Sequence, residues 1–248
     1  IFDYPKPYSL ISKIAKFCTH IDEIILDFFA GSGTTAHAVM QLNAEDGGSR
    51  RFICVQIDEK TDAKSEAFKA GYASIFDITK ARIEKAASKI IADNPINTAA
   101  SGDYGFKIFE TLPMFDKYLD EPDELTENLK LFDATQLTQA DRHNLMLTWA
   151  VRDRIELTET LKPIDLNGYT AYCAKAILYF VEPNITLEAV IKLLEQLDDV
   201  ESMKDFKPNK LVVCGWLIES KIQREMSEAL KHYNNRKGIE LTLDIRYN

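Results

Sequence analysis

A run of small residues, Ala30-Gly31-Ser32-Gly33-Thr34-Thr35, follows directly after an apolar run that ends at Phe29. A glycine turn at the carboxyl end of a strand lets a ligand approach the backbone closely. This turn lacks the third glycine of a dinucleotide fingerprint and the Lys-Ser/Thr pair of a phosphate-binding loop. Asp27, near the end of the apolar run, would repel a pyrophosphate but attract an ammonium or sulfonium group. The pattern predicts a site for S-adenosylmethionine, and a turn that serves only strand and helix packing is the alternative.

A strand, a helix and a second strand must position this turn. We expect strands over residues 23–29 and 52–57, the second one fully buried, with a helix over 36–42 between them. Ser32, Thr34 or Thr35 is expected to cap that helix. Such a unit gives parallel strands joined by a right-handed crossover, so the pattern predicts an α/β sheet. A helix over 77–91 and a further strand over 104–110 are expected to follow.

An acidic stretch at residues 116–127 marks the predicted domain boundary. We expect a cofactor-binding part over residues 1–115, an acidic linker over 116–130 and a smaller α/β unit over 131–248. In that last unit the apolar spacing predicts one or two strands within 169–181, strands at 211–213 and 239–245, and helices over 140–152, 186–197 and 218–233. Asn184 or Thr186 is expected to cap the second of these helices. No glycine turn or polar cluster occurs there, so assembly is its expected role.

Composition limits the partners and the chemistry. With 39 acidic and 30 basic side chains the net charge is −9, which excludes DNA binding through a broadly positive surface. The chain has no apolar run of membrane-spanning length and no signal-peptide pattern, which favours a cytoplasmic location. The four cysteines form no Cys-x-x-Cys pair, so we expect reduced thiols in or near the core, and the four histidines lack metal-ligand spacing. The aromatic residues near the turn are expected in the core: Tyr8, Phe17, Phe28 and Phe29.

A resemblance sharpens this interpretation. The order of five segments resembles the carboxyl-terminal part of β-class DNA methyltransferases. These segments are the Pro5-Lys6-Pro7 element, the Asp27-to-Thr35 glycine motif, V-Q-I-D-E at 55–59, the stretch at 71–86 and D-Y-G-F-K-I-F at 103–109. The closest likeness is to the modification (Mod) subunits of type III restriction-modification systems, which methylate adenine N6. The resemblance implies a partial Rossmann-like sheet with S-adenosylmethionine as cofactor. It also implies DNA, a restriction (Res) subunit and a second copy of the chain as partners of the full-length enzyme.

The same resemblance assigns candidate roles in cofactor binding. Asp27 would meet the amino group of the methionine moiety, and Lys6 its carboxylate. In the family an acid at the end of the second strand takes the ribose hydroxyls, because a carboxylate can accept both hydrogen bonds. Gln56 stands at that position and Asp58 follows on the same face, so either of them would have this role. The remaining candidates line the turn or its border: Phe29, Ala30, Gly31, Ser32, Gly33 and Thr34. Phe28 stands where the wider class commonly has proline.

The catalytic motif of this class is missing from the sequence. Methyl transfer to a base amine needs a D-P-P-Y type loop to hold the flipped base, and no two prolines are adjacent in the 248 residues. In the family this motif precedes the Pro-Lys-Pro element, and the chain begins at Ile1. We therefore expect a carboxyl-terminal fragment with no catalytic residues, unable to methylate DNA by itself. A nucleotide-linked oxidoreductase and a non-catalytic assembly module are the alternatives.

Overall fold

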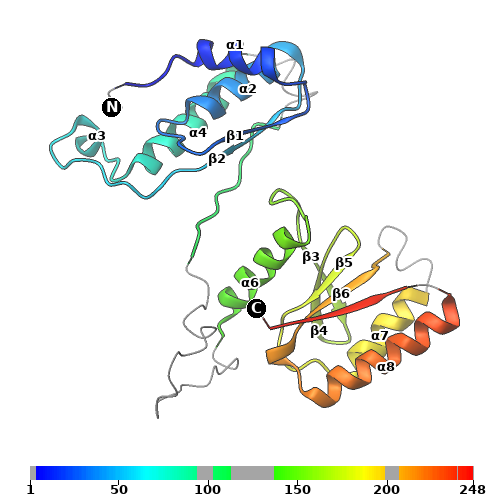
Figure 1. Ribbon diagram of the computed structural model, residues 1–248. Helices are drawn as coiled ribbons and strands as arrows, with labels where there is room; N and C mark the ends of the chain where they lie inside the picture. The colour runs from blue at the N-terminus through cyan, green and yellow to red at the C-terminus, as the bar shows by residue number, and fades with distance from the viewer. Residues whose placement is uncertain (1–3, 94–102, 113–136, 199–206, 239, 248) are drawn as a thin grey trace, which may run out of the picture. The chain divides into compact units, whose positions relative to one another are not determined.

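The computed structural model describes residues 4–93, 103–112, 137–198, 207–238 and 240–247. The chain divides into two compact units, residues 1–106 and residues 107–248 (Figure 1). Each unit contains its own β-sheet, so the molecule is a mixed α/β protein with two sheets. The predicted acidic linker, residues 116–130, lies outside the described residues. In the described part of the chain no helix is both long and apolar enough to cross a membrane.

The first unit is built around the predicted strand–helix–strand arrangement. Strand β1 runs parallel to β2, with Ile24 opposite Arg51 and Asp27 opposite Cys54. Helix α2 begins two residues earlier and ends four residues later than predicted. The elements of this unit are α1 (Tyr8–Cys18), β1 (Ile24–Asp27), α2 (Thr34–Asp46), β2 (Arg51–Cys54), α3 (Glu66–Lys69) and α4 (Ile75–Asp93).

The predicted hydroxyl cap of α2 is wrong. The N-cap residue is Gly33, in the left-handed conformation, and it has no side chain to accept a hydrogen bond. The nearby hydroxyls have other partners: those of Ser32 and Thr34 lie 3.1 Å apart, and Thr35 donates to Asp27. These side chains therefore hold the turn together instead of capping the helix.

One face of the β1–β2 pair is covered and the other is open. Phe52 and Cys54 point toward a core made by α2 and α4, which contains Ala36, Met40 and Ile83. The opposite face presents apolar side chains that are 43–49% exposed, namely Ile24, Leu26, Ile53 and Val55. The prediction of a fully buried second strand is therefore wrong, because only alternate residues of β2 meet a helix layer among the described residues.

Several smaller expectations for this unit are also wrong. Residues 104–110 form no strand, although Tyr104 and Phe106 pack on the α2–α4 core. The aromatic residues expected in the core are exposed: Tyr8 by 42%, Phe17 by 90%, Phe28 by 64% and Phe29 by 90%. All four cysteines are free, but Cys18 is exposed, in contrast to its expected place near the core.

The second unit contains a five-stranded mixed sheet in the order β3-β4-β5-β6-β7. The first three strands are antiparallel neighbours, and β5, β6 and β7 are parallel. Its elements are α6 (Gln139–Arg152), β3 (Lys162–Leu166), β4 (Tyr169–Ala174), β5 (Ile177–Phe180), α7 (Leu187–Asp198), β6 (Lys210–Cys214), a 3-10 turn η3 (Gly215–Leu217), α8 (Ser220–Lys237) and β7 (Thr242–Arg246). The three predicted helices and the predicted strands are confirmed, and β3 was not predicted.

Helices cover both faces of this sheet (Figure 1). Leu178 and Leu211 belong to a core shared with residues of α7 and α8. Their neighbours Tyr179 and Val212 belong to a second core with Trp149 and other residues of α6. Alternate residues of β5 and β6 thus face opposite helix layers, as expected for buried parallel strands. Thr186 caps α7 as predicted, because its hydroxyl accepts a hydrogen bond from the N–H of Ala189 at 3.3 Å.

Candidate functional site

The candidate site is the glycine turn, which lies where β1 and β2 end. Asp27 is the last residue of β1, and its carbonyl accepts a hydrogen bond from Val55 N–H at 2.8 Å. Two residues beyond Phe28, the N–H of Ala30 donates to the Val55 carbonyl at 3.0 Å. These bonds extend the pairing of the two chain segments past the strands. The sequence therefore correctly located the turn at the carboxyl ends of neighbouring parallel strands.

The turn requires its glycines for conformational and steric reasons. Gly31 has a φ of 52° and Gly33 a φ of 74°, values that other residues adopt only with strain. A Cβ atom on Gly33 would also lie 3.1 Å from the Thr79 carbonyl oxygen and 3.2 Å from its methyl carbon. Helix α4 therefore approaches the turn so closely that a side chain at Gly33 would require Thr79 to shift.

Three side chains from outside the turn hold it in place. The amide oxygen of Gln56, two residues beyond β2, accepts a hydrogen bond from the Gly31 N–H at 2.8 Å. From α4, the Thr79 hydroxyl donates to the Gly31 carbonyl. Arg82 Nη1, also on α4, donates to the hydroxyls of both Ser32 and Thr34 at 2.8 Å. The turn is thus fixed from both the strand side and the helix side.

Asp27 is held as tightly as the turn itself. Its Oδ1 accepts a hydrogen bond from the Phe29 N–H at 3.0 Å, and its Oδ2 accepts one from the Thr35 hydroxyl at 2.6 Å. A carboxylate has further lone pairs and can accept additional hydrogen bonds. The structure therefore presents an oriented negative charge beside the turn, as the sequence indicated.

Two ionisable groups near the turn have lowered pKa values. Burial lowers the pKa of Arg82, and burial together with the charges of Arg82 and Lys89 lowers the pKa of His37. His37 is neutral at neutral pH for this reason, and its Nδ1 is buried without a partner among the described residues. Cys54, at the end of β2, is no nucleophile, because burial and the charge of Asp27 raise its pKa to about 11.

The remaining predicted site residues lie at the edge of this arrangement. Lys6 is exposed, but Tyr8 two residues later stacks on His37 of α2, with ring centroids 4.6 Å apart. The Pro-Lys-Pro element is thus anchored beside the first turn of α2. Asp58 forms an exposed ion pair with Lys60 at 2.6 Å. Of the two candidates for binding the ribose, Gln56 has both ends of its amide engaged. Its Oε1 accepts a hydrogen bond from the Gly31 N–H, and its Nε2 donates to the Ile57 carbonyl at 3.1 Å.

Sequence reasoning missed Thr79 and Arg82. Both lie on the predicted helix over 77–91, three residues apart and therefore on one face of it. Their contacts with the turn join residues 48 to 50 positions apart in the sequence. No local signal identifies such a contact, because it depends on how α4 packs against α2.

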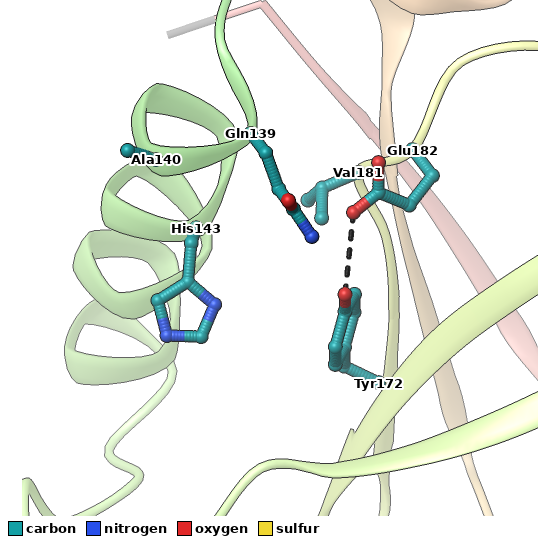
Figure 2. A pocket seen from close by; sticks show the side chains of 6 residues that line it. All are labelled: Gln139, Ala140, His143, Tyr172, Val181 and Glu182. Carbon is teal, nitrogen blue, oxygen red and sulfur yellow. Dashed lines mark hydrogen bonds between the residues drawn. The ribbon is translucent and has the colours of Figure 1, made fainter.

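A pocket lies in the carboxyl-terminal unit (Figure 2). This pocket of about 310 Å³ is lined by Gln139, Ala140, His143, Tyr172, Val181 and Glu182. The Glu182 carboxylate is already engaged: Arg142 lies 2.8 Å from it, and the Tyr172 hydroxyl donates to it at 3.2 Å. Among the described residues, no group of three or more His, Cys, Asp or Glu side chains could hold a metal ion. The pocket is therefore a cavity whose carboxylate is already paired.

Two family models match separate parts of the chain. A DNA methylase model matches residues 1–67, in the first unit, and a model described as the type III R-M EcoP15I C-terminal domain matches residues 140–239, in the second.

The chain is also similar along almost its whole length to two curated proteins. It is 44% identical over 246 residues to the type III restriction-modification enzyme EcoPI Mod subunit of Escherichia phage P1, and 41% identical over 245 residues to the EcoP15I Mod subunit of Escherichia coli. Each alignment covers 99% of this chain, but the chain spans only 37% and 36% of those relatives. The type II methyltransferase M.KpnI of Klebsiella pneumoniae is 45% identical over 83 residues, which are 34% of this chain and 20% of that protein.

The expected resemblance is confirmed by these matches. The DNA methylase match falls on the unit that contains the glycine turn, and the carboxyl-terminal domain match falls on the five-stranded sheet. The chain therefore belongs to the family of type III restriction-modification Mod subunits, a family of DNA methyltransferases, and corresponds to a portion of them that includes the carboxyl-terminal domain.

Proposed function

We propose that this chain is the cofactor-binding part of a DNA methyltransferase that methylates adenine N6 in a restriction-modification system. The observation that carries the proposal is the glycine turn at the ends of β1 and β2, with the Asp27 carboxylate fixed beside it. When bound, S-adenosylmethionine supplies the methyl group for the reaction.

The residues of the turn fit the methionine end of this cofactor. Gly31 and Ser32 place no large side chain at the turn, which favours a ligand close to the backbone, and Gly33 allows α4 to pack against the turn. Asp27 would bind the amino group, and Thr34 begins the helix whose positive end favours a carboxylate. Ala30 and Phe29 would border the site, Lys6 would lie near the carboxylate, and Gln56 or Asp58 would take the ribose hydroxyls.

The proposed chemistry requires a second half of the site. Methyl transfer needs a flipped base with its amine aligned to the methyl carbon, and such positioning contributes roughly 7–11 kcal/mol to lowering a barrier. The 248 residues contain no pair of adjacent prolines and have a net charge of −9. We propose that the chain as given binds cofactor without methylating DNA, and that the full-length protein contacts DNA through other residues.

The carboxyl-terminal unit is assigned to assembly. It has helices on both faces of its sheet, and the Glu182 carboxylate in its pocket is already paired. We assign to this unit the contacts with a second copy of the chain and with a restriction subunit, in a cytoplasmic enzyme.

The cofactor site is tested by calorimetric titration of the full-length protein with S-adenosylmethionine. Gly33→Val places a side chain against Thr79, and Asp27→Asn removes the charge while keeping the size of the side chain. Each is expected to weaken binding by at least about tenfold, equivalent to about 1.4 kcal/mol.

Matched controls separate site effects from folding effects. Gly47→Val also places a side chain at a left-handed glycine, but at the other end of α2, and Asp22→Asn removes an exposed carboxylate before β1. Unchanged affinity in both site variants, with the protein folded, would refute the site assignment.

A further inference from the structure

Arg82 has more hydrogen-bonding capacity than the protein uses. A guanidinium has five N–H donors, yet only Nη1 has partners among the described residues, the hydroxyls of Ser32 and Thr34. Its Nε and Nη2 have no partner in that part of the chain, and neither atom is sealed from solvent. The side chain is therefore held at the turn by one nitrogen and keeps two nitrogens available to a ligand.

The charge of Arg82 is also unbalanced. No carboxylate in the described part of the chain forms an ion pair with it, and burial lowers its pKa. Desolvating a cation without a counter-charge costs free energy that ordinary packing does not recover. An unpaired, part-buried cation beside a ligand-sized turn is typical of a binding group.

Asp27 and Arg82 place groups of opposite charge at the start of α2. Arg82 is bonded to the hydroxyl of Thr34, and Asp27 is bonded to the hydroxyl of the next residue, Thr35. A fixed cation and a fixed anion are thus tied to consecutive residues at the start of α2. An α-amino acid carries an ammonium and a carboxylate on one carbon, so both charges are complemented at once.

We propose that Arg82 binds the carboxylate of the methionine moiety of S-adenosylmethionine, opposite Asp27 at its ammonium; this inference rests on the proposed function. Lys6 is the competing cation, but it is exposed on the segment before α1, and the nearby ring contact with α2 is made by Tyr8, the first residue of α1. Arg82 is fixed by two buried hydroxyls, so it is the better organised of the two cations.

The test compares two ligands that differ only in the carboxylate, S-adenosylmethionine and decarboxylated S-adenosylmethionine, by calorimetry on the full-length protein. The wild type is expected to prefer the carboxylated ligand by about tenfold or more. Arg82→Gln is expected to lose this preference by weakening only the carboxylated ligand. Arg82→Lys, which keeps the charge, should retain part of it, and the control Lys80→Gln, at an exposed lysine of the same helix, should retain it fully. Lys6→Gln is measured in parallel.

The outcomes separate the possible failures. If Arg82→Gln and Arg82→Lys weaken both ligands equally, Arg82 only supports the turn and the inference is wrong. If the preference disappears in Lys6→Gln and persists in Arg82→Gln, Lys6 is the carboxylate ligand and the inference is also wrong. If the folded wild type binds neither ligand, the proposed function fails and the inference fails with it. Circular dichroism of each variant establishes that it is folded.

Discussion

The two sheets of this molecule differ in how completely they are covered. In the carboxyl-terminal unit, β5 and β6 place alternate side chains in two separate cores, and Leu178, Tyr179, Leu211 and Val212 are all fully buried. In the amino-terminal unit, β1 and β2 have the alternating burial of strands covered on one face, although both are parallel. Parallel strands are ordinarily buried on both faces. The comparison indicates that the sheet beside the glycine turn is the less fully covered of the two.

The two units also differ in how they use charge. In the carboxyl-terminal unit, Asp153 is 8% exposed and accepts hydrogen bonds from Lys210, Arg246 and Tyr179 at 2.7–3.0 Å. Every charge in that group has an opposite partner. At the glycine turn, by contrast, the partners of Arg82 within the described ranges are hydroxyl groups only. One set of charges stabilises a fold, and the other is left available to a ligand.

The largest expected effect is on the folding of the separated units. Residues 107–248 produced alone are expected to fold and to unfold in one cooperative transition. Residues 1–106 alone are expected to unfold at a lower temperature and to bind a hydrophobic dye, because one sheet face is apolar and exposed. Both tryptophans, Trp149 and Trp216, lie in the second unit, so their fluorescence reports on it alone. Thermal melts followed by circular dichroism and fluorescence make the comparison.

This prediction also applies to the intact 248-residue chain. Fluorescence and circular dichroism should give different midpoints there, with the circular dichroism change starting at lower temperature. Coincident transitions, or equally cooperative melts of the two separated units, would contradict the idea that the amino-terminal sheet is the less complete one.

The next largest effect concerns the buried charge group. Asp153→Ala removes one of the two carboxylates that pair with Lys210 and Arg246, while the other, Asp244, stays in place. The expected cost is therefore about 1–3 kcal/mol of unfolding free energy. Glu195→Ala removes a carboxylate whose contact with Lys192 is exposed and 3.7 Å long, so its expected cost is about 0–1 kcal/mol. Urea unfolding followed by tryptophan fluorescence measures both. If the two variants lose equal unfolding free energy, the group around Asp153 stabilises this unit no more than an exposed ion pair does.

The same two units show what sequence could and could not predict. The turn was located correctly, since an apolar run that ends at Phe29, with Asp27 near its end, and a glycine pair are local signals. Its support by Thr79 and Arg82 could not be found, because those contacts cross 48 to 50 residues. Full burial of residues 52–57 was predicted from apolar composition alone. Composition does not indicate whether other elements cover one face of a strand or both.

A local signal was overlooked in the second unit. Asn167 and Gly168, with φ values of 57° and 87°, form the turn between β3 and β4. An Asn-Gly pair is a strong indication of a hairpin, so the preceding strand could have been predicted. Its composition obscured it, because Lys162-Pro163-Ile164-Asp165-Leu166 has a proline in the strand. Proline is compatible with this position since β3 is an edge strand.

The smallest expected effect is a difference in pH dependence between the units. The pKa of His37 is lowered in the folded state from its ordinary value of 6.5, mainly by burial. The unfolded chain therefore binds a proton more readily, so the contribution of neutral His37 is fully present above about pH 6.5 and is lost as the pH falls through the folded pKa. In the second unit, Asp153 also has a lowered pKa, but from 3.8, so its contribution is lost only at lower pH. Between pH 7.5 and 5.5 the first unit should lose stability and the second should not.

His37→Phe tests this assignment, because phenylalanine keeps a ring to stack on Tyr8 but does not titrate. The variant is expected to lose less stability than the wild type between pH 7.5 and 5.5 when urea unfolding of the 248-residue chain is followed by circular dichroism. His232→Gln, an exposed histidine of α8, is the control and should leave the pH dependence unchanged. Tryptophan fluorescence, which follows the second unit, should show no effect of His37→Phe. If His37→Phe keeps the wild-type pH dependence, or alters the fluorescence transition instead, the histidine beside the glycine turn is not the group that makes the first unit sensitive to mild acid.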